Sequence, residues 1–245
     1  MGDPYPIVPV EVEPVHTKYR TICSPIPHPE SIPILEELRK NEPLCMEGQP
    51  PIVWDRAENF SVYDAWGNRW IDFSSGVLIT NAGHGRKQMV QAIVQQASSP
   101  LLTSYCFANA ARRELTALLQ KQAPHKDDKV MLLSTGSEAV ELCIKLCREY
   151  GRRSGKKDPV LVTFENAFHG RTFGSQRAGG IPSLKEWIGY PDEHFITVPF
   201  PDGGIRSRKE ENDFSAFERA LAERGIDPDR VCGVLSETYQ GGNSS

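Results

Sequence analysis

Two short stretches of the sequence offer groups that could bind a ligand. Thr135-Gly136-Ser137 is predicted to open a helix, where outward-pointing backbone amides and the helix dipole favour an anion such as a phosphate. Further along, Phe168 offers a ring face to a planar heterocycle, and Arg171 can hold a carboxylate through paired hydrogen bonds. Together they predict a site for a planar, phosphorylated cofactor and a substrate that carries a carboxylate.

Each of these residues also has an ordinary structural interpretation. Thr135 and Glu138 have the spacing of a capping box, in which a helix satisfies its own first amides. Phe168 could be a core residue and Arg171 a solvated surface charge. For His169, a structural hydrogen bond is favoured over proton transfer. The glycine patterns of nucleotide-phosphate loops do not occur in the sequence, so such loops are not supported.

The composition narrows the class of protein. The 245 residues are 39% hydrophobic and 24% charged, with a net charge of −4 and scattered Lys and Arg, which argues against nucleic acid or a membrane as a partner. No apolar run is long enough for a membrane helix, and the start lacks the pattern of a signal peptide. The protein is therefore predicted to be cytoplasmic, with free cysteines. Cys143 and Cys147 could share a metal, but packing on the apolar face of a helix is favoured.

The first part of the chain is rich in proline and then changes character. Proline removes backbone donors and fixes φ, so residues 1–51 are predicted to be largely extended, with one short helix over Ser31–Lys40. Phe60–Asp64 and Arg69–Phe73 alternate in polarity around Gly67-Asn68, which predicts a β-hairpin.

From residue 85 onwards, hydrophobic periodicity predicts helices that alternate with strands. Such alternation is typical of an α/β fold, with a mostly parallel sheet covered by helices. The predicted helices are one that carries Met89, Val90, Ile93 and Ala97, one capped by Asn109, Ser137–Tyr150 ending at Gly151, and one from Phe214 ending at Gly225. The predicted strands are Val130–Leu133, Val160–Phe164 and Val231–Leu235, with a long loop up to Asp213.

Several motifs taken together carry a resemblance to a known family. Thr135-Gly136-Ser137-Glu138-Ala139, Phe168-His169-Gly170-Arg171-Thr172 and Glu237-x-x-Gln240-Gly241 resemble, in order and spacing, the class III aminotransferases. These are the fold-type I enzymes that depend on pyridoxal 5'-phosphate. Asp72-Phe73-Ser74-Ser75-Gly76 and Asn81-Ala82-Gly83-His84 match the family as well. The Phe-His-Gly-Arg-Thr stretch is most similar to the acetylornithine, ornithine and 4-aminobutyrate branch.

The resemblance implies a fold and a domain organisation. The fold would be that of aspartate aminotransferase-like transferases, truncated so that only the N-terminal part is present. Residues 1–51 would be a Pro-rich extended segment, residues 52–84 a hairpin and the N-terminal part of the small domain, and residues 85–245 an incomplete large cofactor-binding domain. The full-length protein would be a homodimer.

The resemblance also implies roles for individual residues around the cofactor. The backbone amides of Gly136 and Ser137 would hold the cofactor phosphate, and the Phe168 ring would stack on the pyridine ring. Glu237 would belong to the polar network beside that ring. The lysine that forms the Schiff base and the aspartate that pairs with the pyridinium nitrogen would follow Ser245. No catalytic residue is therefore expected here, and the chain is expected to be inactive by itself.

On the substrate side, the resemblance implies that Arg171 binds the α-carboxylate of an amino acid. Val77 and the Tyr105–Phe107 stretch would lie near the substrate pocket. Gly242 stands where many members of the family have a glutamate that gates the choice of substrate, so pairing with 2-oxoglutarate is in question.

The expected function is transfer of an amino group between an amino acid of the ornithine, acetylornithine or ω-amino acid type and an oxo acid. Both partners are small molecules, and neither nucleic acid nor a membrane is expected. One alternative is a decarboxylase or epimerase with the same fold and cofactor. The other is a non-catalytic protein that uses the same scaffold to bind a phosphorylated ligand or a partner.

Overall fold

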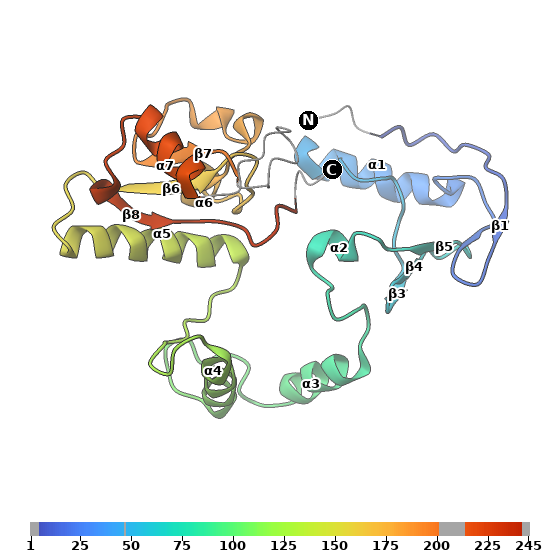
Figure 1. The fold of residues 1–245 in the computed structure, drawn as a ribbon. Coiled ribbons are helices and arrows are strands. Elements are labelled where there is room, and N and C mark those ends of the chain that lie inside the picture. The colour runs from blue at the N-terminus through green and yellow to red at the C-terminus, as the bar shows by residue number, and fades with distance from the viewer. Residues whose placement is uncertain (1–4, 47, 201–213, 242–245) are drawn as a thin grey trace. The chain divides into compact units, whose positions relative to one another are not determined.

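The computed structural model describes residues 5–46, 48–200 and 214–241. Gly242, at which the sequence departs from the family pattern, lies outside these ranges. The chain divides into two compact units, Met1–Arg113 and Glu114–Ser245, whose elements are labelled in Figure 1. Within the described ranges, no helix combines the length and apolar character needed to span a membrane.

The first unit is built on a sheet of five short antiparallel strands in the order β1-β2-β5-β4-β3. The predicted hairpin is confirmed, because β4 and β5 pair with Val62 opposite Trp70. The first two strands were not predicted, and they turn part of the Pro-rich segment back onto the hairpin. The strands are β1 (Val15–His16), β2 (Thr21–Ile22), β3 (Arg56–Glu58), β4 (Ser61–Tyr63) and β5 (Arg69–Ile71).

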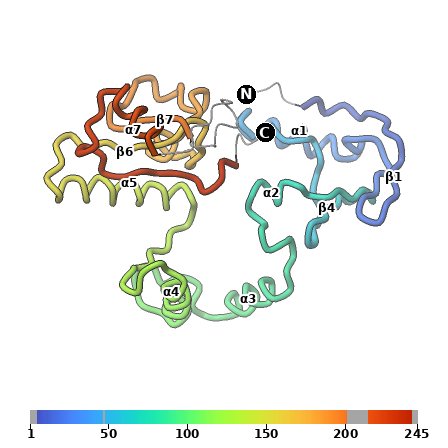
Figure 2. The backbone as a smooth tube through the Cα atoms, in the orientation of Figure 1, coloured from blue at the N-terminus to red at the C-terminus, as the bar shows by residue number. Residues whose placement is uncertain are grey.

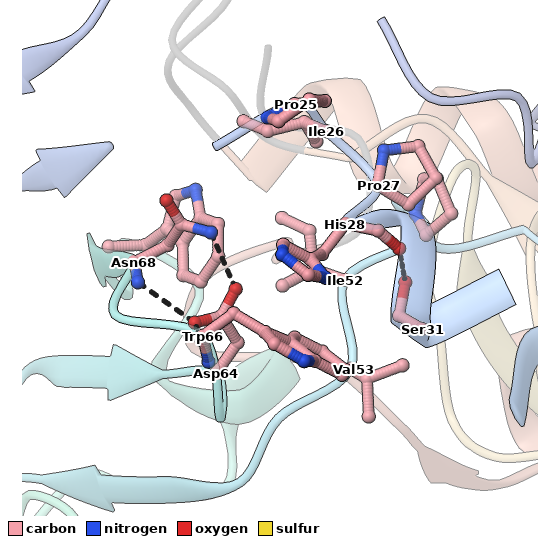
Figure 3. A pocket seen from close by; sticks show the side chains of 12 residues that line it. Pro25, Ile26, Pro27, His28, Ser31, Ile52, Val53, Asp64, Trp66 and Asn68 are labelled. Carbon is pink, nitrogen blue, oxygen red and sulfur yellow. Dashed lines mark hydrogen bonds between the residues drawn. The ribbon is translucent and has the colours of Figure 1, made fainter. Parts of the chain in front are cut away.

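The side chain of Asn68 ties the hairpin turn to the Pro-rich segment. Its amide nitrogen donates to Asp64 Oδ2 at 2.6 Å and to Ser24 Oγ at 2.7 Å, and its Oδ1 accepts from Cys23 N at 2.8 Å. Figure 3 shows this turn beside the stacked rings of His28 and Trp66, whose centroids lie 4.6 Å apart. Because Asn68 is only 1% exposed, water cannot replace these partners.

Replacement of Asn68 by alanine should destabilise this unit. The Asn68→Ala variant leaves Cys23 N and the Asp64 carboxylate with lost partners in a buried place, which costs roughly 2 kcal/mol of unfolding free energy. Denaturant titration measures this change, with the exposed Asn41→Ala as the control. Equal stability of the two variants would contradict the anchoring role of Asn68.

The helices of the first unit largely follow the sequence prediction. Helices α1 (Ile32–Asn41) and α3 (Lys87–Ala97) are confirmed, and α4 (Ala110–Gln122) begins after Asn109. The Asn109 Oδ1 accepts from Arg112 N at 2.8 Å, so it caps α4 as predicted. The division between the units falls within α4.

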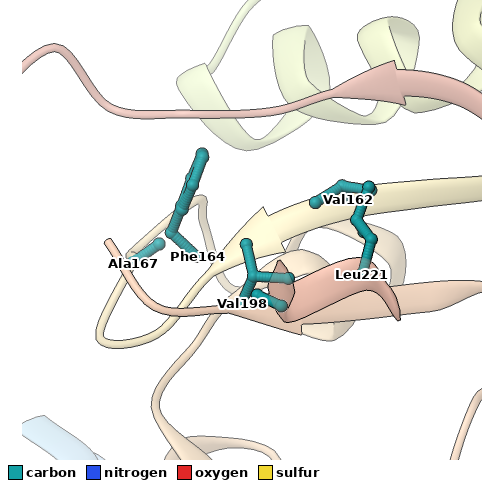
Figure 4. Close-up of a cluster of buried hydrophobic side chains, with 6 residues drawn as sticks. Val162, Phe164, Ala167, Val198 and Leu221 are labelled. Atoms are coloured by element: carbon teal, nitrogen blue, oxygen red, sulfur yellow. The ribbon is translucent and has the colours of Figure 1, made fainter. Parts of the chain in front are cut away.

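The second unit is a three-stranded parallel sheet between helices, in the order β7-β6-β8. Val162, Phe164 and Leu221 belong to a core on the side of α7 (Figure 4), whereas Leu161 packs with Ile144 of α5. Because neighbouring side chains of β6 point to opposite faces, the two helices cover opposite sides of the sheet (Figure 1). The elements are α5 (Gly136–Arg153), β6 (Val160–Phe164), α6 (Phe173–Ala178), β7 (Phe195–Val198), α7 (Phe214–Glu223) and β8 (Val231–Val234).

The sequence prediction was wrong at two places in the second unit, whose backbone course is drawn in Figure 2. Residues 130–133 form no strand, because no described segment pairs with them. The predicted loop up to Asp213 contains α6 and β7 among its described residues, and residues 201–213 lie outside the described ranges. Strand β7 was not predicted because it is short and is defined by its pairing with β6, which the sequence does not reveal.

Two predictions about α5 are also corrected. The helix does not stop at Gly151 but continues to Arg153. A Cβ at Gly151 would lie 2.8 Å from Cys232 Cβ, so glycine here allows close packing on β8 rather than ending the helix. Cys143, predicted to pack on the apolar face, is exposed, while Cys147 packs against the core as predicted.

Candidate functional site

The start of α5 contains both a capping box and free amides. Thr135 Oγ1 accepts from Glu138 N at 3.1 Å, and Glu138 Oε2 accepts from Thr135 N at 3.0 Å, so the structural interpretation of this motif is correct. The capping box leaves two backbone amides unpaired, since Gly136 N and Ser137 N have no acceptor among the described residues. Capping and anion binding are therefore compatible at this helix end.

Space is open above the first residue of α5. A Cβ built on Gly136 meets no atom within 4 Å, and Gly136 is exposed. An anion can therefore approach the backbone closely at this point. The positive end of an 18-residue helix favours negative charge there.

The loop after β6 lies directly against this helix end. Ser137 Oγ accepts from Arg171 N at 3.2 Å. Gly170 has a φ of +129°, and a Cβ on it would lie 2.4 Å from Ser137 Oγ and 2.6 Å from Ser175 Oγ. Only glycine fits this backbone and this space. The motifs around Ser137 and Arg171, which are distant in sequence, are thus in contact.

Phe168 and Arg171 have fixed backbones and accessible side chains. Phe168 N donates to Glu237 Oε2 at 3.0 Å, and the Phe168 residue is 40% exposed, so it is not the core residue of the alternative interpretation. The Arg171 side chain is exposed, and its guanidinium has no hydrogen bond or ion pair within the described part of the chain. An aromatic face and a free cation are therefore held on one short loop.

The carboxyl ends of two neighbouring parallel strands supply this arrangement. Phe168 follows β6, and Glu237 follows β8, where open α/β sheets commonly bind ligands. Gln240 reinforces the edge, because its Nε2 donates to Glu165 O at 2.7 Å and its side chain is buried. The segment that carries Glu237 is thereby fastened to the end of β6.

His169 lies below this surface as a buried imidazole. It is 8% exposed, and its Nε2 has no hydrogen-bond partner among the described residues. Burial lowers the pKa of His169 below its usual 6.5, although the nearby Glu237 carboxylate opposes the shift. The imidazole is therefore neutral near pH 7.

Val77 belongs to the first unit and is described within it. It lies in α2 (Ser75–Leu78), whose residues all have positive φ, so that this segment is a left-handed turn. For a β-branched residue such as Val77, with a φ of +60°, this conformation is strained. Val77 is 61% exposed and lines an apolar groove of about 750 Å³ together with Trp70. Tyr105, at 94% exposure, and Phe107, at 75%, also belong to this unit.

The carboxylate of Asp72 holds the left-handed turn in place. It accepts from Gly76 N at 2.7 Å and Ser74 N at 3.0 Å, and its Oδ2 lies 2.8 Å from His84 Nε2. Burial opposes ionisation of this carboxyl, but the hydrogen bonds from His84, Ser74 and Gly76 outweigh it and lower the pKa of Asp72 to about 2. Asp72 therefore stays ionised at neutral pH.

Two further groups were not singled out from the sequence. Glu141 on α5 contacts the loop that carries Arg171, and Lys185 Nζ donates to Gly179 O at 2.6 Å, past the C-terminus of α6. Burial, and then the charge of Arg177, lower the pKa of Lys185. No sequence signal marks either contact, because each partner is known only once α6 is in place. In the described residues, no group of three or more His, Cys, Asp or Glu could hold a metal.

Comparison with known proteins adds to this geometry. A family model described as aminotransferase class-III matches residues 45–243. The chain belongs to the class III aminotransferases. It is 36% identical over 134 residues to the acetylornithine aminotransferase of Aquifex aeolicus, an alignment that covers 55% of this chain and 35% of that protein.

Solved structures of aminotransferases share the fold. A thermostable (S)-enantioselective omega-transaminase from Thermomicrobium roseum matches with a TM-score of 0.72 at 25% identity, over 85% of this chain and 50% of that one. The taurine:2-oxoglutarate aminotransferase from Bifidobacterium kashiwanohense, in complex with PLP and glutamate, matches with a TM-score of 0.71 at 23% identity, over 86% and 49% of the two chains. The predicted fold class is confirmed. The chain spans half or less of the length of these three proteins.

Proposed function

We propose that this chain supplies the phosphate-, ring- and carboxylate-binding residues of a pyridoxal phosphate-dependent aminotransferase. Its substrates would be an amino acid of the ornithine, acetylornithine or ω-amino acid type and an oxo acid. The observation that carries the proposal is the contact of Ser137 Oγ with Arg171 N at 3.2 Å, which joins two free amides and a free guanidinium in one place. Membership of the family and the names of the relatives support the type of reaction.

The donor groups at the start of α5 fit the cofactor phosphate. Gly136 N and Ser137 N would donate to its oxygens, and the absence of a Cβ at Gly136 leaves room for the approach. The α5 dipole would favour the dianion over water at this position. These residues bind and orient, and we assign them no part in proton transfer.

The loop after β6 fits the cofactor ring. The accessible face of Phe168 would stack on a planar heterocycle, and the bond from its backbone N–H to Glu237 would keep that face in place. When bound, pyridoxal phosphate supplies an electron sink for the negative charge that develops at the substrate α-carbon. Glu237 would contribute a carboxylate to the polar surroundings of the ring.

The substrate would be oriented by its carboxylate. The Arg171 guanidinium would form paired hydrogen bonds with it, and these fix direction as well as position. The role of Val77 and the 105–107 stretch, which belong to the first unit, in contacting the substrate stays a prediction. We further propose that the protein is cytoplasmic and forms a homodimer. Exposed apolar side chains on α3 support the homodimer: Met89, Val90, Ile93 and Val94.

A product assay on the full-length protein tests the reaction. The assay contains pyridoxal phosphate, an oxo acid, and either ornithine or acetylornithine. The proposal predicts that the oxo acid gains one amino group for each amino group that the amino acid loses. Release of carbon dioxide, or racemisation without an oxo-acid product, would support the decarboxylase or epimerase instead. A protein that binds the cofactor but converts none of these substrates would support the non-catalytic alternative.

Replacement of Gly136 by alanine should separate cofactor binding from folding. At the first position of a helix alanine is tolerated, and its Cβ meets no protein atom, so the stability of the apo protein should be unchanged. The same Cβ would obstruct the phosphate, and we expect roughly tenfold weaker binding of pyridoxal phosphate. Fluorescence titration measures this, with phosphate-free pyridoxal as the control. If Gly136→Ala binds both vitamers as the wild type does, the phosphate lies elsewhere.

A further inference from the structure

The side chain of Glu141 caps a helix other than its own. Glu141 lies on α5, and its Oε1 accepts from Thr172 Oγ1 at 2.5 Å, from Gly174 N at 2.8 Å and from Ser175 N at 3.0 Å. These groups are at the start of α6. Thr172, which occupies the N-cap position of α6, makes no capping hydrogen bond of its own. Glu141 therefore does for α6 what an N-cap side chain normally does.

Glu141 and Ser137 act on the same loop from the same face of α5. They are one helical turn apart, so their side chains lie next to each other on the helix surface. Ser137 Oγ holds Arg171 N at 3.2 Å, and Glu141 holds Thr172, the next residue. The backbone is thus fastened on both sides of the Arg171 side chain.

The contact between α5 and the loop is tight as well as polar. A Cβ on Gly174 would lie 2.2 Å from Glu141 Oε2, so the start of α6 rests directly on this carboxylate. Ser175 is fully buried, and its hydroxyl lies 2.8 Å from Thr172 Oγ1. Loss of the carboxylate would leave the amides of Gly174 and Ser175 without an acceptor in a poorly hydrated place.

We propose that Glu141 is a positioning residue that sets Arg171 to receive the substrate carboxylate. This inference rests on the proposed function and gives it a determinant that neither binds the cofactor nor touches the substrate. A loop fixed before the substrate arrives loses less freedom on binding, so Glu141 acts on affinity for carboxylate-bearing substrates. The charge of Glu141 matters because bonds from amides to an ionised acceptor are stronger than those to a neutral one.

Two measurements on the full-length protein test this role. The first is hydrogen exchange of the peptide 168–176 in the apo protein, which should be roughly tenfold faster in Glu141→Ala than in the wild type. The second compares ornithine with its decarboxylated counterpart. Glu141→Ala should raise KM for ornithine roughly tenfold, with kcat within about twofold, and leave KM for the counterpart unchanged. Glu141→Gln keeps an oxygen acceptor but loses the charge, so both changes should be smaller than in Glu141→Ala without returning to wild-type values.

Controls separate this role from general destabilisation. Glu149→Gln removes a carboxylate from the far end of α5, where its partners are Arg152 and Arg153, and should leave exchange and KM unchanged. If Glu141→Ala does not fold, Thr172→Val removes one of the bonds and should give a smaller change in the same direction. An equal rise of KM for both substrates, or unchanged exchange, overturns the inference. A wild type without transaminase activity overturns the proposed function, and with it the role at the substrate.

Discussion

Alanine in place of Gly170 should abolish the candidate site and strongly destabilise the second unit. The φ of +129° at Gly170 is closed to residues with a Cβ, and the new atom would lie 2.4 Å from Ser137 Oγ. Backbone strain and overpacking each cost about 1–3 kcal/mol, so we expect a loss of roughly 4 kcal/mol in unfolding free energy. Relief of the overlap would move the loop away from α5, and with it Phe168 and Arg171.

Denaturant titration of the full-length protein measures the loss in Gly170→Ala, and fluorescence titration measures the affinity for pyridoxal phosphate. Gly155→Ala is the matched control, because Gly155 also has a positive φ but its Cβ would meet nothing within 4 Å. It should cost only about 1 kcal/mol and leave cofactor binding unchanged. If the two variants lose equal stability, the contact between the loop and α5 does not constrain Gly170.

Loss of the Arg171 guanidinium should affect the substrate and spare the fold. The side chain is exposed and has no partner in the described part of the chain, so Arg171→Gln should change stability little. Two charge-assisted hydrogen bonds to a carboxylate are worth about 3 kcal/mol here, which corresponds to a roughly 100-fold rise in KM. The decarboxylated counterpart of the substrate should be unaffected.

Steady-state kinetics on both substrates measures this difference. Arg152→Gln is the control, since Arg152 is an exposed arginine on α5 paired with Glu149 and distant in sequence from the loop. Its KM values should match those of the wild type. A similar KM increase for both substrates in Arg171→Gln would assign Arg171 to a general electrostatic role rather than to carboxylate binding.

Local chemistry explains which parts of the fold the sequence predicted correctly. Val160–Phe164 is apolar except for Thr163, as is typical of a fully buried parallel strand, and it forms β6 as expected. The apolar run at 130–133 looks similar in sequence but has no neighbouring strand in the described residues. A strand is completed by its partner, and a single apolar run does not reveal whether a partner is present.

Glycines show the same limit of sequence reasoning. Gly151 follows a long helical pattern and precedes two arginines, so a helix stop was the natural prediction. Its actual role depends on Cys232 and Pro159, which lie within about 3 Å of a Cβ built there. A glycine that ends a helix in the left-handed conformation and a glycine that allows close packing look the same in a sequence. Only the tertiary structure distinguishes the two roles.

The candidate site was predictable as a set of residues and not as an arrangement. Gly136 and Arg171 were found because an amide at a helix start and a free guanidinium are groups whose chemistry is evident one residue at a time. Only the backbone amide of Ser137 was given a role from the sequence, yet the Ser137 hydroxyl joins the two motifs. Glu141 was missed because its partners are remote in sequence and belong to a helix, α6, that was predicted as a loop.

The most direct test is a crystal structure of the full-length protein with pyridoxal phosphate. We predict phosphate oxygens at about 2.7–3.2 Å from both Gly136 N and Ser137 N, with the pyridine ring stacked on Phe168. A phosphate bound away from the first turn of α5, or a ring with no contact to Phe168, would contradict the account.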